Sequence, residues 1–181
     1  MAPEPVRFLF HRPLPYVDPQ TVRGPLKRAL VAAGSSPLTR RLSTTRLWRK
    51  TVWKIEPTLQ RLSGGRLTTA VGLPTALLET RGARTGQWRR NGVIYFHDGD
   101  QVTIVASQAG YPRNPAWYYN LIANPDVRLG GQTFRARVVV AEAERARLWR
   151  LADDVFPAFV SYRQSAGRYG RQIPIIQLAA Y

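Results

Sequence analysis

The sequence predicts a mainly β protein with helices, in the α+β class: an antiparallel β-barrel with helices packed on it and a helical arm before it. Six short runs rich in β-branched and aromatic residues follow Pro74. Asp98-Gly99 and Gly130-Gly131 each separate two of these runs, as hairpin turns do. Only two helical patterns lie between the runs, which is too few for a sheet in which strands and helices alternate.

Each expected element has its own sequence signals. Helix 114–124 begins with Asn114 as a candidate N-cap and Pro115 in its first turn. Helix 142–156 is a longer amphipathic helix. The expected strands cover residues 75–80, 89–97, 101–107, 127–131, 133–141 and 174–180.

Residues 1–70 are expected to form a basic arm before a barrel domain of residues 71–181. The arm has 13 Lys and Arg against three Asp and Glu, so it carries +10 of the net charge of +16. Within it, residues 36–56 predict a basic amphipathic helix with Trp48 and Trp53 on its apolar side. One position for this helix is an anionic membrane surface. The alternative is that the apolar side packs on the barrel or on a second subunit, as in a homodimer.

The composition excludes several kinds of site. The 181 residues include no Cys, which excludes disulfides, thiolate metal sites and Cys nucleophiles. His11 and His97 lack a metal-ligand spacing, so we expect no metal. No signal peptide and no apolar run of roughly 20 residues are present. We therefore expect a cytoplasmic protein whose arm can lie peripherally on the inner face of the cell membrane, and no nucleic-acid partner, since the cations follow no nucleic-acid-binding motif.

An unusual concentration of cations lies between the first two expected strands. Residues 80–90, TRGARTGQWRR, contain four arginines, two glycines and no acid. Backbone N–H groups at such glycines can approach an anion closely, and Arg84, Arg89 and Arg90 could pair with it. The alternative is a solvated basic hairpin. The spacing is not that of a P-loop.

A second cluster, residues 107–120, joins a strand end to a helix start. Loop amides and helix N-termini favour anions or electron-rich carbonyls, and Trp117 with its two neighbouring tyrosines could offer a stacking surface. Alternatively, these aromatic residues belong to the core. Neither cluster contains a nucleophile beside a base, so a cofactor would carry any chemistry.

Two motifs identify a family resemblance: G-x-R-T-G-x-x-R at 82–89 and N-P-x-W-Y-x-N at 114–120. With residues 156–178, they make the region from about 70 to 180 similar to the deazaflavin-dependent nitroreductase family of the actinobacterial type. The resemblance implies a split β-barrel of the flavin-reductase or FMN-binding kind and the cofactor coenzyme F420. This coenzyme carries a phosphodiester and an oligoglutamate tail, a polyanion that suits the arginines.

The resemblance also implies roles for individual residues. The turn would hold the coenzyme phosphate, the strand end and loop would line the deazaflavin ring, and the helix start would close over it. Ser107 and Tyr162 are implied as catalytic donors to the acceptor oxygen, and Phe156, Phe159 and Tyr162 as the substrate pocket. The implied coenzyme-binding residues are Arg84, Thr85, Gly86, Gln87, Arg89, Ala106, Gln108, Ala109, Gly110, Asn114, Ala116 and Trp117.

The chain departs from the family pattern at four positions. Ala83 and Gln108 stand where relatives often carry a basic residue, and Phe156 and Phe159 replace two of three pocket tyrosines. From the resemblance we expect an F420H2-dependent oxidoreductase that reduces a lipophilic acceptor. This acceptor would be a quinone, an activated alkene or a nitro compound. Alternatives are an FMN-binding split-barrel oxidoreductase, a non-catalytic deazaflavin carrier and a basic surface-binding protein.

Overall fold

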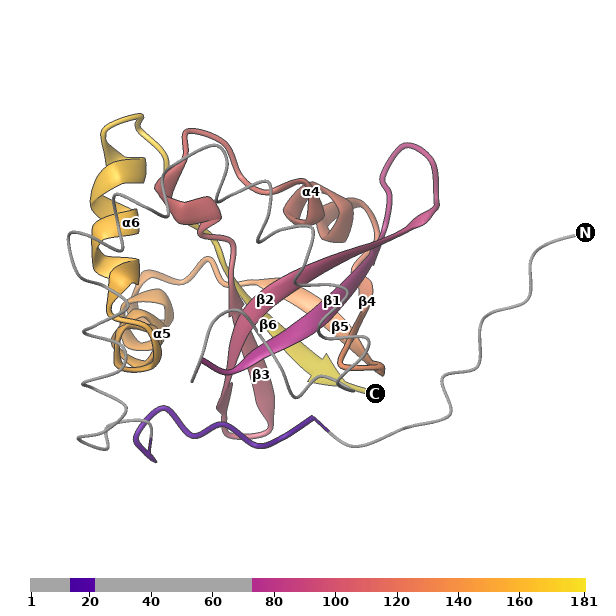
Figure 1. Ribbon diagram of the computed structural model, residues 1–181, viewed down its shortest axis with the longest axis horizontal. Helices are drawn as coiled ribbons and strands as arrows, with labels where there is room; N and C mark the ends of the chain where they lie inside the picture. The colour runs from indigo at the N-terminus through magenta and orange to yellow at the C-terminus, as the bar shows by residue number, and fades with distance from the viewer. Residues whose placement is uncertain (1–13, 22–72) are drawn as a thin grey trace, which may run out of the picture.

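The computed structural model describes residues 14–21 and 73–181, which form one barrel with helices around it (Figure 1). The predicted strands are all present, with ends that differ by a few residues. They are β1 (Thr75–Arg81), β2 (Trp88–Asp98), β3 (Gln101–Val105), β4 (Asp126–Leu129), β5 (Gln132–Val138) and β6 (Ile175–Ala180). The helices are α4 (Ala116–Ala123), α5 (Glu142–Val155) and α6 (Ala158–Gly167), with a short 3-10 turn η2 (Gln108–Gly110).

The six strands close into a barrel in the order β1-β2-β3-β6-β5-β4, and all neighbours pair antiparallel. The predicted Asp-Gly and Gly-Gly turns form the β2–β3 and β4–β5 hairpins. Gly99, Gly130 and Gly131 there have φ of 60°, 57° and 86°, values that favour glycine. The predicted antiparallel barrel is therefore confirmed.

Alternation along the strands divides the apolar side chains into two cores. Val102 and Ile104 of β3 point into the barrel, where Trp117 and Leu121 of α4 also pack. Val105 of β3 lies in a second buried cluster, with residues of α5 and α6 on the outside of the barrel. Strands β3 and β6 are therefore covered on both faces, and α4 closes one end of the barrel.

Two expectations about the helices were wrong. We expected two helices after residue 71, but the described residues also contain α6, which begins just after Pro157. Asn114 is not the N-cap of α4, because Pro115 holds that position and no side chain caps the helix. The expected helix at residues 36–56 lies outside the described residues.

Part of the expected arm, residues 14–21, packs on the barrel beside the β2–β3 hairpin (Figure 1). Val17 N–H donates to His97 Nδ1 at 3.0 Å, and His97 N–H donates to the Val17 carbonyl at 2.8 Å. Tyr95 Oη donates to the Pro15 carbonyl at 3.0 Å. None of the helices described is long and apolar enough to cross a membrane.

Candidate active site

The turn between β1 and β2 is closed by its own backbone. Gly82 N–H donates to the Gln87 carbonyl, and Gly86 N–H donates to the Gly82 carbonyl, both at 2.8 Å. Gly86 has φ of 66°. A Cβ on Gly82 would lie 2.9 Å from Thr85 Oγ1. The N–H groups of both glycines are therefore used within the turn, and anion binding by the other groups of the turn stays a prediction.

Helix α4 holds this turn in place. The Asn120 carboxamide accepts from Ala83 N–H at 3.1 Å and donates to Thr80 Oγ1 at 3.1 Å, so it joins the turn to β1. Asn124 donates to the Arg81 carbonyl at 3.4 Å. Sequence reasoning missed the role of Asn120, although this residue ends the N-P-x-W-Y-x-N motif that links α4 to the turn.

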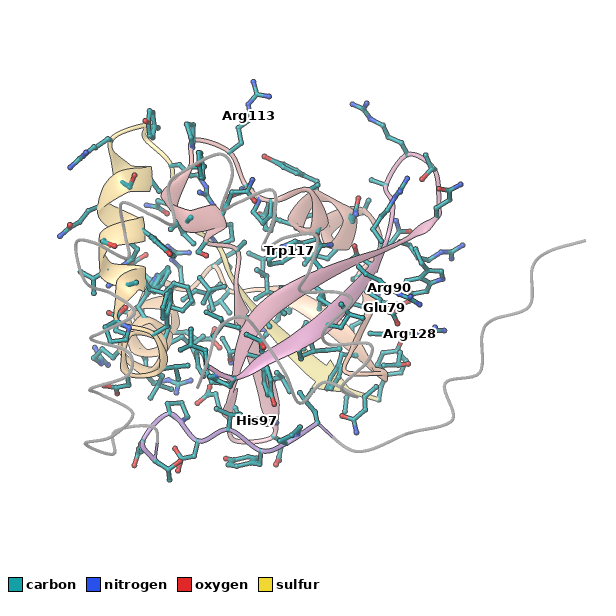
Figure 2. All side chains as sticks on the ribbon, in the orientation of Figure 1. Glu79, Arg90, His97, Arg113, Trp117 and Arg128 are labelled. Atoms are coloured by element: carbon teal, nitrogen blue, oxygen red, sulfur yellow. The ribbon has the colours of Figure 1, made fainter. Side chains whose placement is uncertain are left out.

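Arg90 is committed to a buried acid. It lies directly opposite Glu79 in the β1–β2 register, and its Nε lies 2.6 Å from Glu79 Oε1 (Figure 2). Glu79 is only 7% exposed. An unpaired carboxylate at that depth would be costly, so Arg90 stabilises the fold, and the expectation that it pairs with a ligand is not supported by the geometry.

Arg84 and Arg89 are the exposed cations on the turn and its strand end. Arg84 is exposed at the tip, and Arg89 is exposed with a 3.3 Å hydrogen bond from Nη2 to Gln87 Oε1. Arg81 lines a separate hollow with Trp88 and Arg128, whose guanidinium lies 4.7 Å from the Trp88 ring. The turn therefore presents two cations to solvent, with Thr85, Gly86 and Gln87 exposed between them.

The loop after β3 has an uncommon backbone. Gln108, Ala109 and Gly110 follow one another with φ of 48°, 51° and 75°. The left-handed region costs a non-glycine residue about 1–2 kcal/mol, and such strain is often found at ligand sites. A Cβ on Gly110 would lie 2.7 Å from the Tyr162 carbonyl oxygen. Glycine at this position therefore lets the loop pack directly against α6.

The guanidinium of Arg171 bonds to the carbonyl oxygens of this loop. Arg171 donates to the carbonyls of Ala106, Ser107 and Tyr111, the last two at 3.1 and 2.6 Å. Its Nε donates to Asn114 Oδ1 at 2.7 Å. The Asn114 side chain is therefore bonded to Arg171 and does not cap α4. Sequence reasoning missed Arg171, because main-chain acceptors distant in the chain leave no pattern of partner side chains.

The predicted ring contacts at the start of α4 differ in exposure. Ala116 is exposed and Asn114 is half-buried, whereas Trp117 is 5% exposed and packs in the barrel core. Figure 2 shows Trp117 among the core side chains and Arg113, next to the loop, pointing away from the fold. The position of Trp117 fits the alternative that it is a core aromatic residue.

The three predicted pocket aromatics lie together. Phe156 lies just before α6, and Phe159 and Tyr162 lie on it, with ring centroids 5.1 to 6.3 Å apart in edge-to-face contacts. Phe159 is 2% exposed, while Phe156 and Tyr162 are half-buried. Tyr162 is the only member of the three that carries a hydroxyl, and its backbone lies against the Gly110 position of the loop.

The turn, α4, the loop and α6 all lie at one end of the molecule, the upper end in Figure 1. From the turn toward α6, this end presents exposed cations and then the left-handed loop with half-buried Ser107. The aromatic cluster belongs to the second core, between α5 and α6 on the outside of the barrel. Ala106 is fully buried at the end of β3, whereas Gln108 and Ala109 are exposed. The described residues contain no group of three or more His, Cys, Asp or Glu that could hold a metal ion.

This arrangement offers binding groups without a nucleophile and base in contact. His97, the one histidine described, lies at the opposite end of the barrel (Figure 2). Such a site suits a barrel protein that binds a coenzyme and leaves the chemistry to it.

The comparison with protein families is specific. A model of the family F420H(2)-dependent quinone reductase matches residues 49–179. The chain therefore belongs to the F420H(2)-dependent quinone reductase family; it is an oxidoreductase, and its cofactor is coenzyme F420. The resemblance noted from the sequence is confirmed, and the family name specifies a quinone acceptor.

Individual relatives agree with this family. An F420H(2)-dependent quinone reductase of Mycobacterium tuberculosis is 39% identical over 110 residues, which cover 58% of this chain and 72% of the relative. A solved F420-H2 dependent reductase matches with a TM-score of 0.50 and 31% identity, covering 58% of this chain and 93% of that one. A second solved structure, described as a domain-swapped dimer, matches with a TM-score of 0.53 and 28% identity, covering 69% and 96%.

The residues present suit a coenzyme with a flat ring and a polyanionic tail. Arg84 and Arg89 supply charge at one side, and the exposed left-handed loop supplies backbone. Within residues 14–21 and 73–181, the N–H groups of Gln108 and Ala109 have no hydrogen-bond partner, so they are available to ring carbonyls.

Proposed function

We propose that the protein binds reduced coenzyme F420 across this end of the barrel and transfers a hydride from it to a quinone. The observation that carries the proposal is the position of the left-handed loop between the exposed cations and α6, against which Gly110 packs. Arg84 and Arg89 then bind the coenzyme phosphate, together with Thr85, Gly86 and Gln87. The loop, from Ala106 to Gly110, and Ala116 at the start of α4 line the ring. Asn114, bonded to Arg171, and Trp117, packed in the barrel core, hold these segments in place.

The protein contributes position and polarity to this reaction. When bound, the coenzyme supplies a hydride, and the quinone takes up this hydride and one solvent proton to become a hydroquinone. Ser107 and Tyr162 donate hydrogen bonds to the acceptor oxygen on which negative charge develops. Phe156 and Phe159 form the apolar wall that excludes water from the acceptor and favours a flat, lipophilic molecule.

The direct test combines binding with turnover. The full chain is titrated with coenzyme F420 and with FMN, and oxidation of the reduced coenzyme is then followed with a quinone, an activated alkene or a nitro compound. We expect tighter binding of coenzyme F420 than of FMN, and faster turnover with the quinone than with the other two acceptors. Tighter FMN binding would support the FMN-binding alternative, and oxidation at one rate with or without any acceptor would support a carrier.

Tyr162→Phe tests the role of the hydroxyl. A hydrogen bond that strengthens in the transition state changes turnover more than binding. We expect kcat with a quinone to fall several-fold while the Kd for the coenzyme stays unchanged. Phe156→Leu, which changes only the apolar wall, serves as the comparison and should mainly raise the KM for the quinone. A wild-type kcat for Tyr162→Phe would make Tyr162 a structural residue.

We also propose that residues 36–56 bring the enzyme to the anionic membranes in which lipophilic quinones dissolve. The support is the basic, Trp-containing sequence pattern, in which each cation near an anionic surface contributes about 1 kcal/mol. We expect the full chain to sediment with anionic vesicles, and Trp48→Ala with Trp53→Ala to weaken this strongly. Equal sedimentation of the wild type and the double variant would favour the alternative, in which the apolar side of residues 36–56 packs on the barrel or on a second subunit of a homodimer.

A further inference from the structure

We infer that Arg171 is a positioning residue for the coenzyme: it fixes the loop of residues 106–111 in its left-handed form and so sets which loop N–H groups face the ring. The inference rests on the proposed function, because it takes this loop as the ring-binding segment. Arg171 itself lies behind the loop, in the segment between α6 and β6, and it contacts the carbonyl oxygens of the loop.

The number and type of its partners distinguish Arg171 from the surface arginines. Its guanidinium donates to three main-chain carbonyls of one short segment and to Asn114 Oδ1. It is half-buried, and burial lowers its pKa, although an arginine stays charged at neutral pH. In the part of the chain that the structure describes, no carboxylate bonds to Arg171. The loop carbonyls therefore satisfy this half-buried cation, and the cation in turn orders the loop.

The orientation of the loop amides follows from peptide geometry. In a trans peptide, the carbonyl of one residue and the N–H of the next point in opposite directions. Because the Ser107 carbonyl points toward Arg171, the N–H of Gln108 points away from it. Within the described residues, this N–H and the N–H of Ala109 have no hydrogen-bond partner.

The loop needs the hydrogen bonds from Arg171, because its backbone does not favour the left-handed conformation by itself. Gln108 and Ala109 are both left-handed, with φ of 48° and 51°, and neither is glycine. Two internal hydrogen bonds, from Gly110 N–H to the Ser107 carbonyl and from Tyr111 N–H to the Gln108 carbonyl, are both 3.0 Å long. Without Arg171, we expect the loop to sample right-handed or extended conformations in which the Gln108 N–H turns away from the ligand.

The experiment compares Arg171→Gln with Arg147→Gln in the full chain. Arg147 is a matched control, since it also makes two short bonds, of 2.7 and 2.6 Å, to Asp98 at the β2–β3 hairpin, far from the loop. Amide hydrogen exchange of the coenzyme-free proteins, and the Kd for coenzyme F420, are measured equally far below each Tm. We expect exchange at Gly110 and Tyr111 to accelerate at least tenfold, and the Kd to rise at least tenfold, in Arg171→Gln only.

Arg171→Lys adds a second variant that keeps the charge. An ammonium group can donate to some of the four acceptors but cannot reach them with a planar fork, so we expect intermediate exchange and an intermediate Kd. If Arg171→Gln does not fold, the same criteria apply to Arg171→Lys. Unchanged loop exchange, an unchanged coenzyme Kd despite faster exchange, or an equal loss of affinity in Arg147→Gln would each overturn the inference.

Failure of the proposed function has a different signature. If the coenzyme binds elsewhere, Arg84→Ala and Arg89→Ala bind it like the wild type. The exchange measurement on the coenzyme-free protein would still report whether Arg171 orders the loop.

Discussion

Arg89 and Arg90 are adjacent in β2, yet their surroundings give them different roles. Successive strand residues point to opposite faces, and Arg90 points to the buried Glu79 carboxylate, whereas Arg89 stays exposed beside Gln87. The charge counted from the sequence therefore exceeds the charge available to a ligand. Arg84 and Arg89 are therefore the two residues of this turn that we expect to bind the coenzyme.

We therefore predict that Arg84→Ala and Arg89→Ala each weaken binding of coenzyme F420 by roughly tenfold to a hundredfold. Each variant removes a charge-assisted contact to the phosphate or tail. Fluorescence titration of the coenzyme measures the effect. Arg81→Ala is the control, because Arg81 lines the hollow beside Trp88, and it should bind like the wild type.

A coenzyme fragment without phosphate and tail completes a double-mutant cycle for these arginines. The loss caused by Arg84→Ala should shrink with the fragment, because the partner of the side chain is already absent. Added salt should weaken the intact coenzyme more than the fragment. Equal losses for both ligands would argue against a phosphate contact.

We also predict different costs for two glycines with similar backbone angles. Gly99 and Gly110 have φ of 60° and 75°, but only at Gly110 would a Cβ meet another atom, the Tyr162 carbonyl at 2.7 Å. Gly99→Ala should cost about 1 kcal/mol from backbone strain alone. Gly110→Ala should lower the Tm further and weaken coenzyme binding, because the loop must move off α6. Equal Tm values for the two variants would contradict the close packing.

At the scale of elements, the sequence predicts what depends on local pattern. Hairpin residues such as Asp98-Gly99 and alternating apolar residues are sufficient to locate all six strands. Helix α6 was missed, although Phe156, Phe159 and Tyr162 recur every third residue, a spacing that a helix allows. The clamp by Arg171 could not be predicted, because its acceptors are main-chain carbonyls that any residue type provides.

Asn120 of α4 bonds to the turn between β1 and β2. We therefore predict that replacing it weakens coenzyme binding, although its side chain would not touch the coenzyme. In Asn120→Ala, the turn loses its bonds at Ala83 N–H and Thr80 Oγ1, each worth about 1 kcal/mol. We expect coenzyme affinity to fall several-fold because the turn is less ordered. Asn124→Ala, which loses one longer bond of 3.4 Å, should have a smaller effect. The same titration checks both, and equal affinity for Asn120→Ala and the wild type would contradict the role of α4.

At the scale of the whole molecule, the barrel has one end at which we propose that the coenzyme binds and an opposite end, called the base below. The base carries residues 14–21, which are fastened by Tyr95 and His97, with the Tyr16 ring centroid 4.5 Å from that of His97. Burial raises the pKa of Tyr95 to about 12, so its hydroxyl donates to Pro15 over the whole neutral range. His97, by contrast, is a group that acid protonates. The attachment at the base therefore has one pH-independent contact and one pH-dependent contact.

This difference predicts acid release of residues 14–21. Burial lowers the pKa of His97 below its usual value of about 6.5. A histidine with a lowered pKa in the folded state binds protons more weakly than in the unfolded state, so its contribution to stability is present above pH 6.5 and is lost as pH falls. The cause is direct, since a protonated Nδ1 cannot accept the Val17 N–H. We expect hydrogen exchange at Val17 to accelerate, and the Tm to fall, between pH 7 and pH 5. In His97→Asn, whose carboxamide oxygen can accept without titrating, both changes should be smaller, and the same acid response in this variant would assign the effect to other groups.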